Sequence, residues 1–222
     1  MSGARLRAVF LGAAAAVIVA VGGCGSSGYQ AGDTDYATST SAHMSNGSRA
    51  VLALSQKSPV PLVEGHFTEV VSDRAWVNLP EDEIKDGIDS RQVEFDAKDA
   101  SFRTLTASLE VSGVIAAGKE GAPWKAGDVV KLTLVLFNDS SIDAARDTLT
   151  GLGRVVVPLA SVQRGAFGNI VEPSGGGDII LSVGDNGELL MPLADEAIQA
   201  RVLGSIKVYD DLIRAQTPAS GS

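Results

Sequence analysis

Glu64 and His66 have the types and spacing that acid–base catalysis uses. Side chains alternate between the two faces of a β-strand, so residues two positions apart share a face. A carboxylate on that face can hold an imidazole in the orientation that a general base requires. The pair therefore suggests a hydrolase in which carboxylates or a serine act with His66. No Gly-x-Ser-x-Gly motif follows it, so we favour an exposed strand histidine and keep the hydrolase as the alternative.

A second group with possible chemistry is the acidic segment 81–89, which contains five carboxylates in nine residues. Asp82, Asp86 and Asp89 are candidate oxygen ligands for calcium. Aligned with an EF-hand loop from Asp82, however, the segment has Ile84 at the third position and Val93 at the twelfth, where ligand oxygens are required. We favour a solvated acidic loop, with a calcium-assisted binding module as a further alternative. Zinc and copper need clusters of histidine and cysteine, which the sequence does not offer.

Cys24 is the single cysteine of the 222 residues, so no disulfide can form within the chain. It follows a basic start with Arg5 and Arg7 and a 14-residue apolar run at 8–21. As a helix this run would rise about 21 Å, short of the roughly 30 Å hydrocarbon core of a bilayer. The pattern is therefore typical of a secretory signal peptide over residues 1–23, followed by Cys24.

The residues Val21, Gly22, Gly23 and Cys24 resemble the lipobox of bacterial lipoproteins, in which an aliphatic residue and two small residues precede a cysteine. The resemblance implies cleavage before Cys24, with signal-peptidase recognition through Val21 to Gly23, and thioether attachment of diacylglycerol such as a palmitate-bearing lipid to the thiol. Two acyl chains suffice for stable anchoring. The expected location is the outer side of the cell membrane.

Residues 24–50 contain mostly Gly, Ser, Thr, Asp and Ala and have no apolar periodicity. Such a composition predicts a flexible polar tether, in which His43 is solvated. The sequence then predicts a single β-rich domain over 51–216 and a disordered tail over 217–222.

The formal net charge of the chain is −9, and removal of residues 1–23 leaves 16 basic and 27 acidic residues, a charge of −11. Phosphate backbones favour basic surfaces, so nucleic acid is not expected as a partner. The segment 151–154 lacks the third glycine and the helix of a dinucleotide-binding motif, and we expect no cofactor.

Alternating apolar and polar residues predict strands in the segments 60–71, 104–115 and 128–137, and more weakly in 74–79 and 91–97. Asn186-Gly187 between two apolar runs predicts a hairpin with a type I′ turn. Segment 140–150 predicts a helix capped by Ser140 or Ser141. An apolar stripe from Ile198 onward predicts a C-terminal helix that Gly204 and Ser205 divide in two, with Ser205 as the second cap.

These elements predict a mainly β fold with a C-terminal helix, arranged as a small, partly open barrel or sandwich. The motifs around Val63 and Gly65, then 111–113, 127–131 and 153–159, resemble OB-like domains of secreted bacterial proteins and, more remotely, netrin-like barrels. Inhibitors with netrin-like barrels use a free N-terminal cysteine and several disulfides, so their activity is not implied here. We expect a lipid-anchored envelope protein, not an enzyme, whose β-domain binds a protein partner or ligand at the membrane surface.

Overall fold

A computed structural model describes residues 34–44, 52–85, 88–119, 121–159 and 179–217, and the backbone of two short strands at 163–165 and 168–170. Seven of the described strands form one antiparallel sheet. Its order is β4-β3-β1-β5-β8-β9, with β2 paired to one end of β1. The sheet does not close on itself. The prediction of a mainly β, partly open barrel or sandwich with a C-terminal helix is confirmed.

Three long strands form most of the sheet. They are β1 (Leu62–Asn78), β3 (Phe102–Ala116) and β4 (Val129–Leu136). The shorter strands of the same sheet are β2 (Ser90–Val93), β5 (Val155–Pro158), β8 (Leu181–Val183) and β9 (Leu189–Leu190), while β6 (Gln163–Gly165) and β7 (Gly168–Ile170) form a separate hairpin. A 3-10 turn at Glu81–Glu83 lies between β1 and β2.

Strand β1 joins the segments 60–71 and 74–79, which the sequence pattern divides in two. Its pairing with β3 shifts register at four points, and one shift lies between Ser72 and Ala75. A β-bulge inserts a residue into a ladder and increases its twist without ending the strand. The interruption of the alternation near residue 72 therefore marks a bulge and not a strand end.

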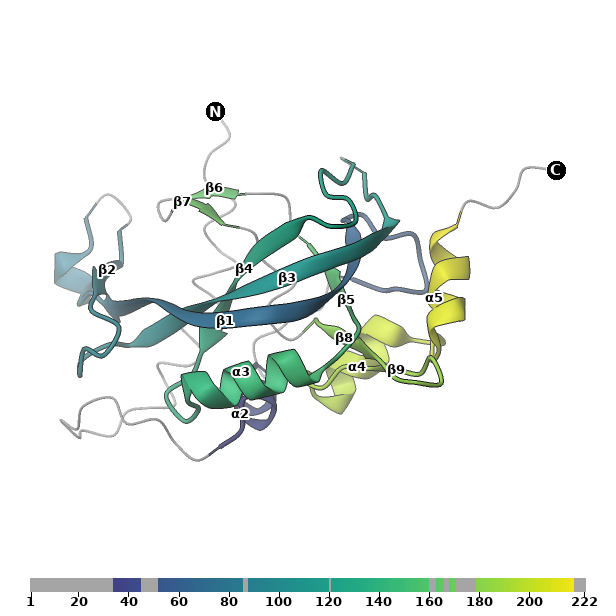
Figure 1. Ribbon diagram of the computed structural model, residues 1–222. Coiled ribbons are helices and arrows are strands. Elements are labelled where there is room, and N and C mark those ends of the chain that lie inside the picture. The colour runs from purple at the N-terminus through teal and green to yellow at the C-terminus, as the bar shows by residue number, and fades with distance from the viewer. Residues whose placement is uncertain are drawn as a thin grey trace.

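The apolar side chains of the sheet pack into two clusters on opposite faces. The first lies under the helix α3 (Ile142–Gly151) and includes Phe67, Leu109, Leu134 and Leu149. The second lies between the β5-β8-β9 end of the sheet and the helices α4 (Glu196–Leu203) and α5 (Tyr209–Gln216). Figure 1 shows α3 along one side of the sheet with α2 beside it, and α4 and α5 near β8 and β9.

One helix start and one helix end agree with the sequence prediction, and a second helix start does not. Ser141 caps α3 by accepting a hydrogen bond from the Ala144 N–H at 3.0 Å, which confirms a cap in this segment. Gly204 ends α4 with φ 56° and so divides the C-terminal helices as predicted. The second helix begins at Tyr209, however, and Ser205 does not cap it. The isolated bridge between Glu188 and Val208 holds Val208 in extended backbone, with φ −129° and ψ 156°, directly before this helix.

The prediction of a flexible tether over 24–50 is wrong for part of that segment. Residues Tyr36–Met44 form the helix α2, and the Tyr36 side chain is only 1% exposed. Tyr36 packs into the cluster under α3, and this burial offsets the entropy cost of ordering the segment. The polar residues around Tyr36 do not bury enough apolar surface to do so. His43, expected in solvent, contacts Asp139 and stacks on Phe137.

Candidate functional site

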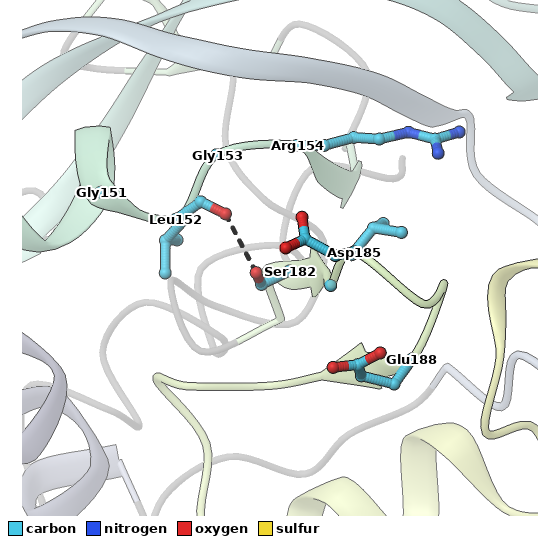
Figure 2. Close-up of a pocket in the computed structure, with 9 residues that line it drawn as sticks. Gly151, Leu152, Gly153, Arg154, Ser182, Asp185 and Glu188 are labelled. Atoms are coloured by element: carbon cyan, nitrogen blue, oxygen red, sulfur yellow. Dashed lines mark hydrogen bonds between the residues drawn. The ribbon is translucent and has the colours of Figure 1, made fainter.

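An open cleft of about 600 Å³ lies between the C-terminal end of α3 and the turn of the β8–β9 hairpin. Its lining consists of residues 151–154, 182–185 and Glu188. Figure 2 shows the Asp185 and Glu188 carboxylates and the Ser182 hydroxyl on the cleft side, whereas the Arg154 side chain extends away from them. The side chains directed to the cleft thus include two carboxylates and a hydroxyl.

One wall of the cleft is the end of α3 and the chain that follows it. The last carbonyls of a helix have no partner within the helix and carry partial negative charge. The Ser182 hydroxyl donates to one of these carbonyls, that of Leu152, at 3.0 Å. Gly153 then adopts φ 67°, a left-handed conformation that favours glycine and turns the chain into β5. The hydrogen bond from Ser182 therefore fixes β8 against this wall.

The other wall is the hairpin turn after β8. The Gly187 N–H donates to the Gly184 carbonyl at 2.8 Å, so Asp185 and Asn186 are the central residues. Gly187 has φ 78°. This is the pattern of a type I turn followed by a G1 bulge. The predicted hairpin is confirmed, but the type I′ turn is wrong because the bulge absorbs the twist one residue later.

A cluster of Glu64, Arg154 and Tyr209 lies behind the cleft and joins β1, the start of β5 and α5. Arg154 binds both Glu64 oxygens, with Nε to Oε1 at 3.0 Å and Nη2 to Oε2 at 3.1 Å. The Tyr209 hydroxyl also donates to Glu64 Oε2. The guanidinium carbon of Arg154 lies 4.0 Å from the centre of the Tyr209 ring. Both carboxylate oxygens of Glu64 are therefore engaged.

The electrostatics of this cluster favour the ionised carboxylate. Burial raises the pKa of Glu64, but the hydrogen bonds from Arg154 and Tyr209 and the Arg154 charge together lower it further, to below its ordinary value. Burial and the neighbouring Glu64 raise the pKa of the Tyr209 hydroxyl. Glu64 thus remains charged and Tyr209 remains a donor over the physiological range, and neither is poised as an acid or base.

His66 does not join Glu64, although the sequence predicts both on one face. Its Nε2 lies 3.7 Å from Glu110 Oε2 on β3, and both side chains are about half exposed. β1 lies between β3 and β5 in the sheet. The His66 side chain is near Glu110 on β3, whereas the Glu64 side chain binds Arg154 at the start of β5. The structure therefore separates the two members of the proposed acid–base pair.

Of the three calcium candidates, the structure describes Asp82 and Asp89. Asp82 lies in the exposed 3-10 turn, and the Asp89 backbone carbonyl accepts a hydrogen bond from the Leu79 N–H at 2.7 Å. Asp86 lies outside the described residues, as do Cys24 and the residues Val21, Gly22 and Gly23. Among the described residues, no group of three or more His, Cys, Asp or Glu side chains is placed to hold a metal ion.

Sequence reasoning missed four residues of this region: Arg154, Asp185, Glu188 and Tyr209. Glu64 is separated from Arg154 by 90 positions and from Tyr209 by 145. No local pattern connects residues so far apart. The Asn-Gly turn signal did locate the hairpin, and its flanking carboxylates were the available indication of the cleft.

The Glu64 cluster predicts an acid dependence of stability. Because the pKa of Glu64 is lower in the folded protein, its contribution is complete above the ordinary glutamate pKa of 4.5 and is lost as the pH falls through the lowered value. In urea unfolding between pH 7 and pH 3, we expect Glu64→Gln to be less stable than the wild type at pH 7. The difference should shrink toward pH 3.

Glu110→Gln is the matched control, since Glu110 is a half-exposed carboxylate on the neighbouring strand. We expect a small difference from the wild type for this control, with little change over the same pH range. A Glu64→Gln difference that stays constant with pH would contradict the assigned electrostatics.

Comparisons of the chain with models of protein families, with curated proteins and with solved structures found no match. None of the helices in the described part of the chain has the length and hydropathy needed to cross a bilayer.

Proposed function

We propose that this protein is a lipid-anchored envelope protein, attached to the outer side of the cell membrane through Cys24, whose β-domain binds a partner protein at the membrane surface. The contact site in this proposal is the cleft between α3 and the β8–β9 turn. It binds its partner without chemical conversion.

The geometry of the cleft is the observation that carries the binding function. The cleft is open, and its walls are fixed by the Ser182 hydrogen bond and the turn at Gly184–Gly187. Polar groups on a preformed concave surface provide specificity at a low cost in ordering entropy. The Asp185 and Glu188 carboxylates and the carbonyl end of α3 give this surface a negative potential. That potential favours a partner that presents basic groups.

The hydrolase alternative has less support. It requires an imidazole oriented by a carboxylate, and His66 lies on the exposed part of β1 beside Glu110 at 3.7 Å. The carboxylate predicted to orient it, Glu64, is held by Arg154 and Tyr209. We therefore do not propose a second function.

The anchor follows from the lipobox residues at 21–24 and the basic and apolar segments before them. A diacylglyceryl group provides two acyl chains, and two chains give the stable attachment that a single chain does not. Mass spectrometry of the N-terminus tests this part directly. We expect an acylated Cys24 and no residues 1–23, and a mature chain that still begins at Met1 would contradict the anchor.

Site-specific cross-linking tests the contact site. A photoreactive residue at Asp185 should give a discrete adduct with one envelope protein when membranes carrying the full chain are irradiated. The same residue at Lys98, an exposed position between β2 and β3, is the matched control and should give no such adduct. Equal adducts from both positions would contradict a binding site at the cleft. In Cys24→Ala, the Asp185 adduct should decrease because the protein is no longer held at the membrane.

A further inference from the structure

Helix α2 is fastened to the domain at its first residue. The Tyr36 ring is buried in the cluster under α3, and its hydroxyl donates to the Val135 carbonyl on β4 at 2.9 Å. The pairing of Val111 with Asp128 makes Val130, Leu132 and Leu134 the β4 residues that exchange backbone hydrogen bonds with β3. The Val135 carbonyl therefore points away from β3, where the Tyr36 hydroxyl reaches it. The docking of α2 thus uses a backbone acceptor that the sheet leaves available.

A second fastening lies one helical turn further on, at Asp139 in the loop between β4 and α3. The Ser39 hydroxyl donates to Asp139 Oδ1, and His43 Nε2 lies 3.2 Å from Asp139 Oδ2. The His43 ring also stacks on Phe137, with the ring centres 4.4 Å apart. Both oxygens of one carboxylate therefore hold α2 in place.

The sequence of α2 makes its helix dependent on these contacts. Its nine residues, YATSTSAHM, are too few for a stable isolated helix, and four of them are Ser or Thr, which favour other conformations. Asp35 supports the start by accepting from the Ala37 and Thr38 N–H groups at 3.0 and 3.1 Å. We expect that loss of the Tyr36 or Asp139 contacts detaches the segment and leaves the sheet intact.

The docked helix shortens the chain available between the lipid attachment residue and the domain. Tyr36 follows Cys24 by 12 positions, whereas Leu52, which is buried in the second cluster, follows it by 28. A fully extended chain spans at most about 3.6 Å per residue. The domain therefore lies no more than about 43 Å from the anchor with α2 docked, and up to about 100 Å with α2 released.

We propose that α2 is a docking strap that holds the β-domain close to the bilayer and turns its α2–α3 side toward the membrane. The inference rests on the proposed lipid attachment at Cys24. The cleft lies at the far end of α3, and ten helical residues rise about 15 Å. Because the cleft borders α3, the proposed orientation also places it on the side of the domain near the membrane, so the partner is one whose binding surface lies close to the bilayer.

Energy transfer to the membrane tests the strap on the full-length acylated protein in liposomes. Because Cys24 is acylated, one introduced cysteine gives a single labelling site. Asp147→Cys places the dye on α3, and Glu110→Cys places it on the opposite face of the sheet. With an acceptor on the lipid headgroups, we expect more efficient transfer from position 147 than from position 110. Asp139→Ala and Tyr36→Ala should each lower the transfer and remove the difference between the two positions.

Ala42→Ser, at an exposed position of α2, is the matched control and should behave as the parent protein does. Hydrogen exchange on the same samples reports docking independently: residues 40–44 should exchange slowly in the parent and in Ala42→Ser, and rapidly in both releasing variants. Equal transfer from positions 147 and 110 in the parent, or unchanged transfer after release, would overturn the strap. Protein that fails to float with the liposomes would instead contradict the lipid attachment, and docking is then judged by the exchange measurement.

Discussion

Replacement of Arg103 by methionine is expected to lower the free energy of unfolding by about 3 to 5 kcal/mol, because three acceptors lose a charged donor in a buried site. The Arg103 side chain is 1% exposed. Its nitrogens donate to the Phe95 carbonyl at 2.7 Å, the Ala97 carbonyl at 2.8 Å and Asn138 Oδ1 at 2.6 Å. It thereby fixes the β2–β3 and β4–α3 loops to the sheet. Urea unfolding at neutral pH measures the loss.

Arg91→Met is the control for this prediction. Arg91 is exposed, and its Nη2 lies 3.6 Å from Asp99 Oδ2. A surface ion pair of this kind contributes about 0 to 1 kcal/mol, so the control should remain close to the wild type. Arg103→Lys keeps the charge but cannot supply the planar set of donors, and it should fall between the wild type and Arg103→Met. Equal stabilities for Arg91→Met and Arg103→Met would contradict the assigned role of Arg103.

Gly65→Ala is the second substitution expected to destabilise strongly, by roughly 2 to 4 kcal/mol, the range of severe core overpacking. A Cβ atom at Gly65 would lie 2.2 Å from the backbone carbonyl oxygen of Glu110. The obstacle is backbone in the adjacent long strand and not a side chain that can turn aside. Relief therefore requires β1 and β3 to separate where they pair. Thermal unfolding followed by circular dichroism should show a clearly lower midpoint.

Gly113→Ala provides the opposite expectation in the same pair of strands. A Cβ atom at Gly113 meets no atom within 4 Å. Replacement of a glycine by alanine without strain reduces the entropy of the unfolded chain and stabilises by about 0.4 to 1 kcal/mol. The two variants should thus shift the midpoint in opposite directions. A similar loss in both would contradict the approach of the Glu110 carbonyl as the cause of the loss at position 65, because position 113 has no such neighbour.

The strands that could be predicted well are those whose side chains alternate without interruption. The predicted segments 104–115 and 128–137 coincide closely with β3 and β4, because one face of each packs into the cluster under α3. The alternation did not predict β1 as one strand, because each bulge in β1 displaces the alternation by a residue. The hairpin at Asn186-Gly187 was predictable because glycine at that position permits a positive φ.

Helix α2 was not predictable by the same means. Its residues have no apolar period, and the contacts that hold it involve Val135 and Asp139, about 100 positions away. The position of Ser205 looked suitable for a cap, yet Ser205 lies in the turn after α4, and the bridge between Glu188 and Val208 delays the second helix to Tyr209. In both cases tertiary contacts outweigh local preference.

The sequence by itself determined the features that depend on neighbours along the chain: the β-rich class, the capped α3, the hairpin and the division of the C-terminal helices. The same local pattern carries the prediction of an acyl-bearing Cys24. Only the tertiary structure decided which side chains meet. It placed Glu64 with Arg154 and Tyr209 and not with His66, formed the cleft beside α3, and docked α2 on Asp139. The physical reason is that hydrogen bonds and charge pairs act over a few ångströms in space, and local sequence does not specify which distant segments approach that closely.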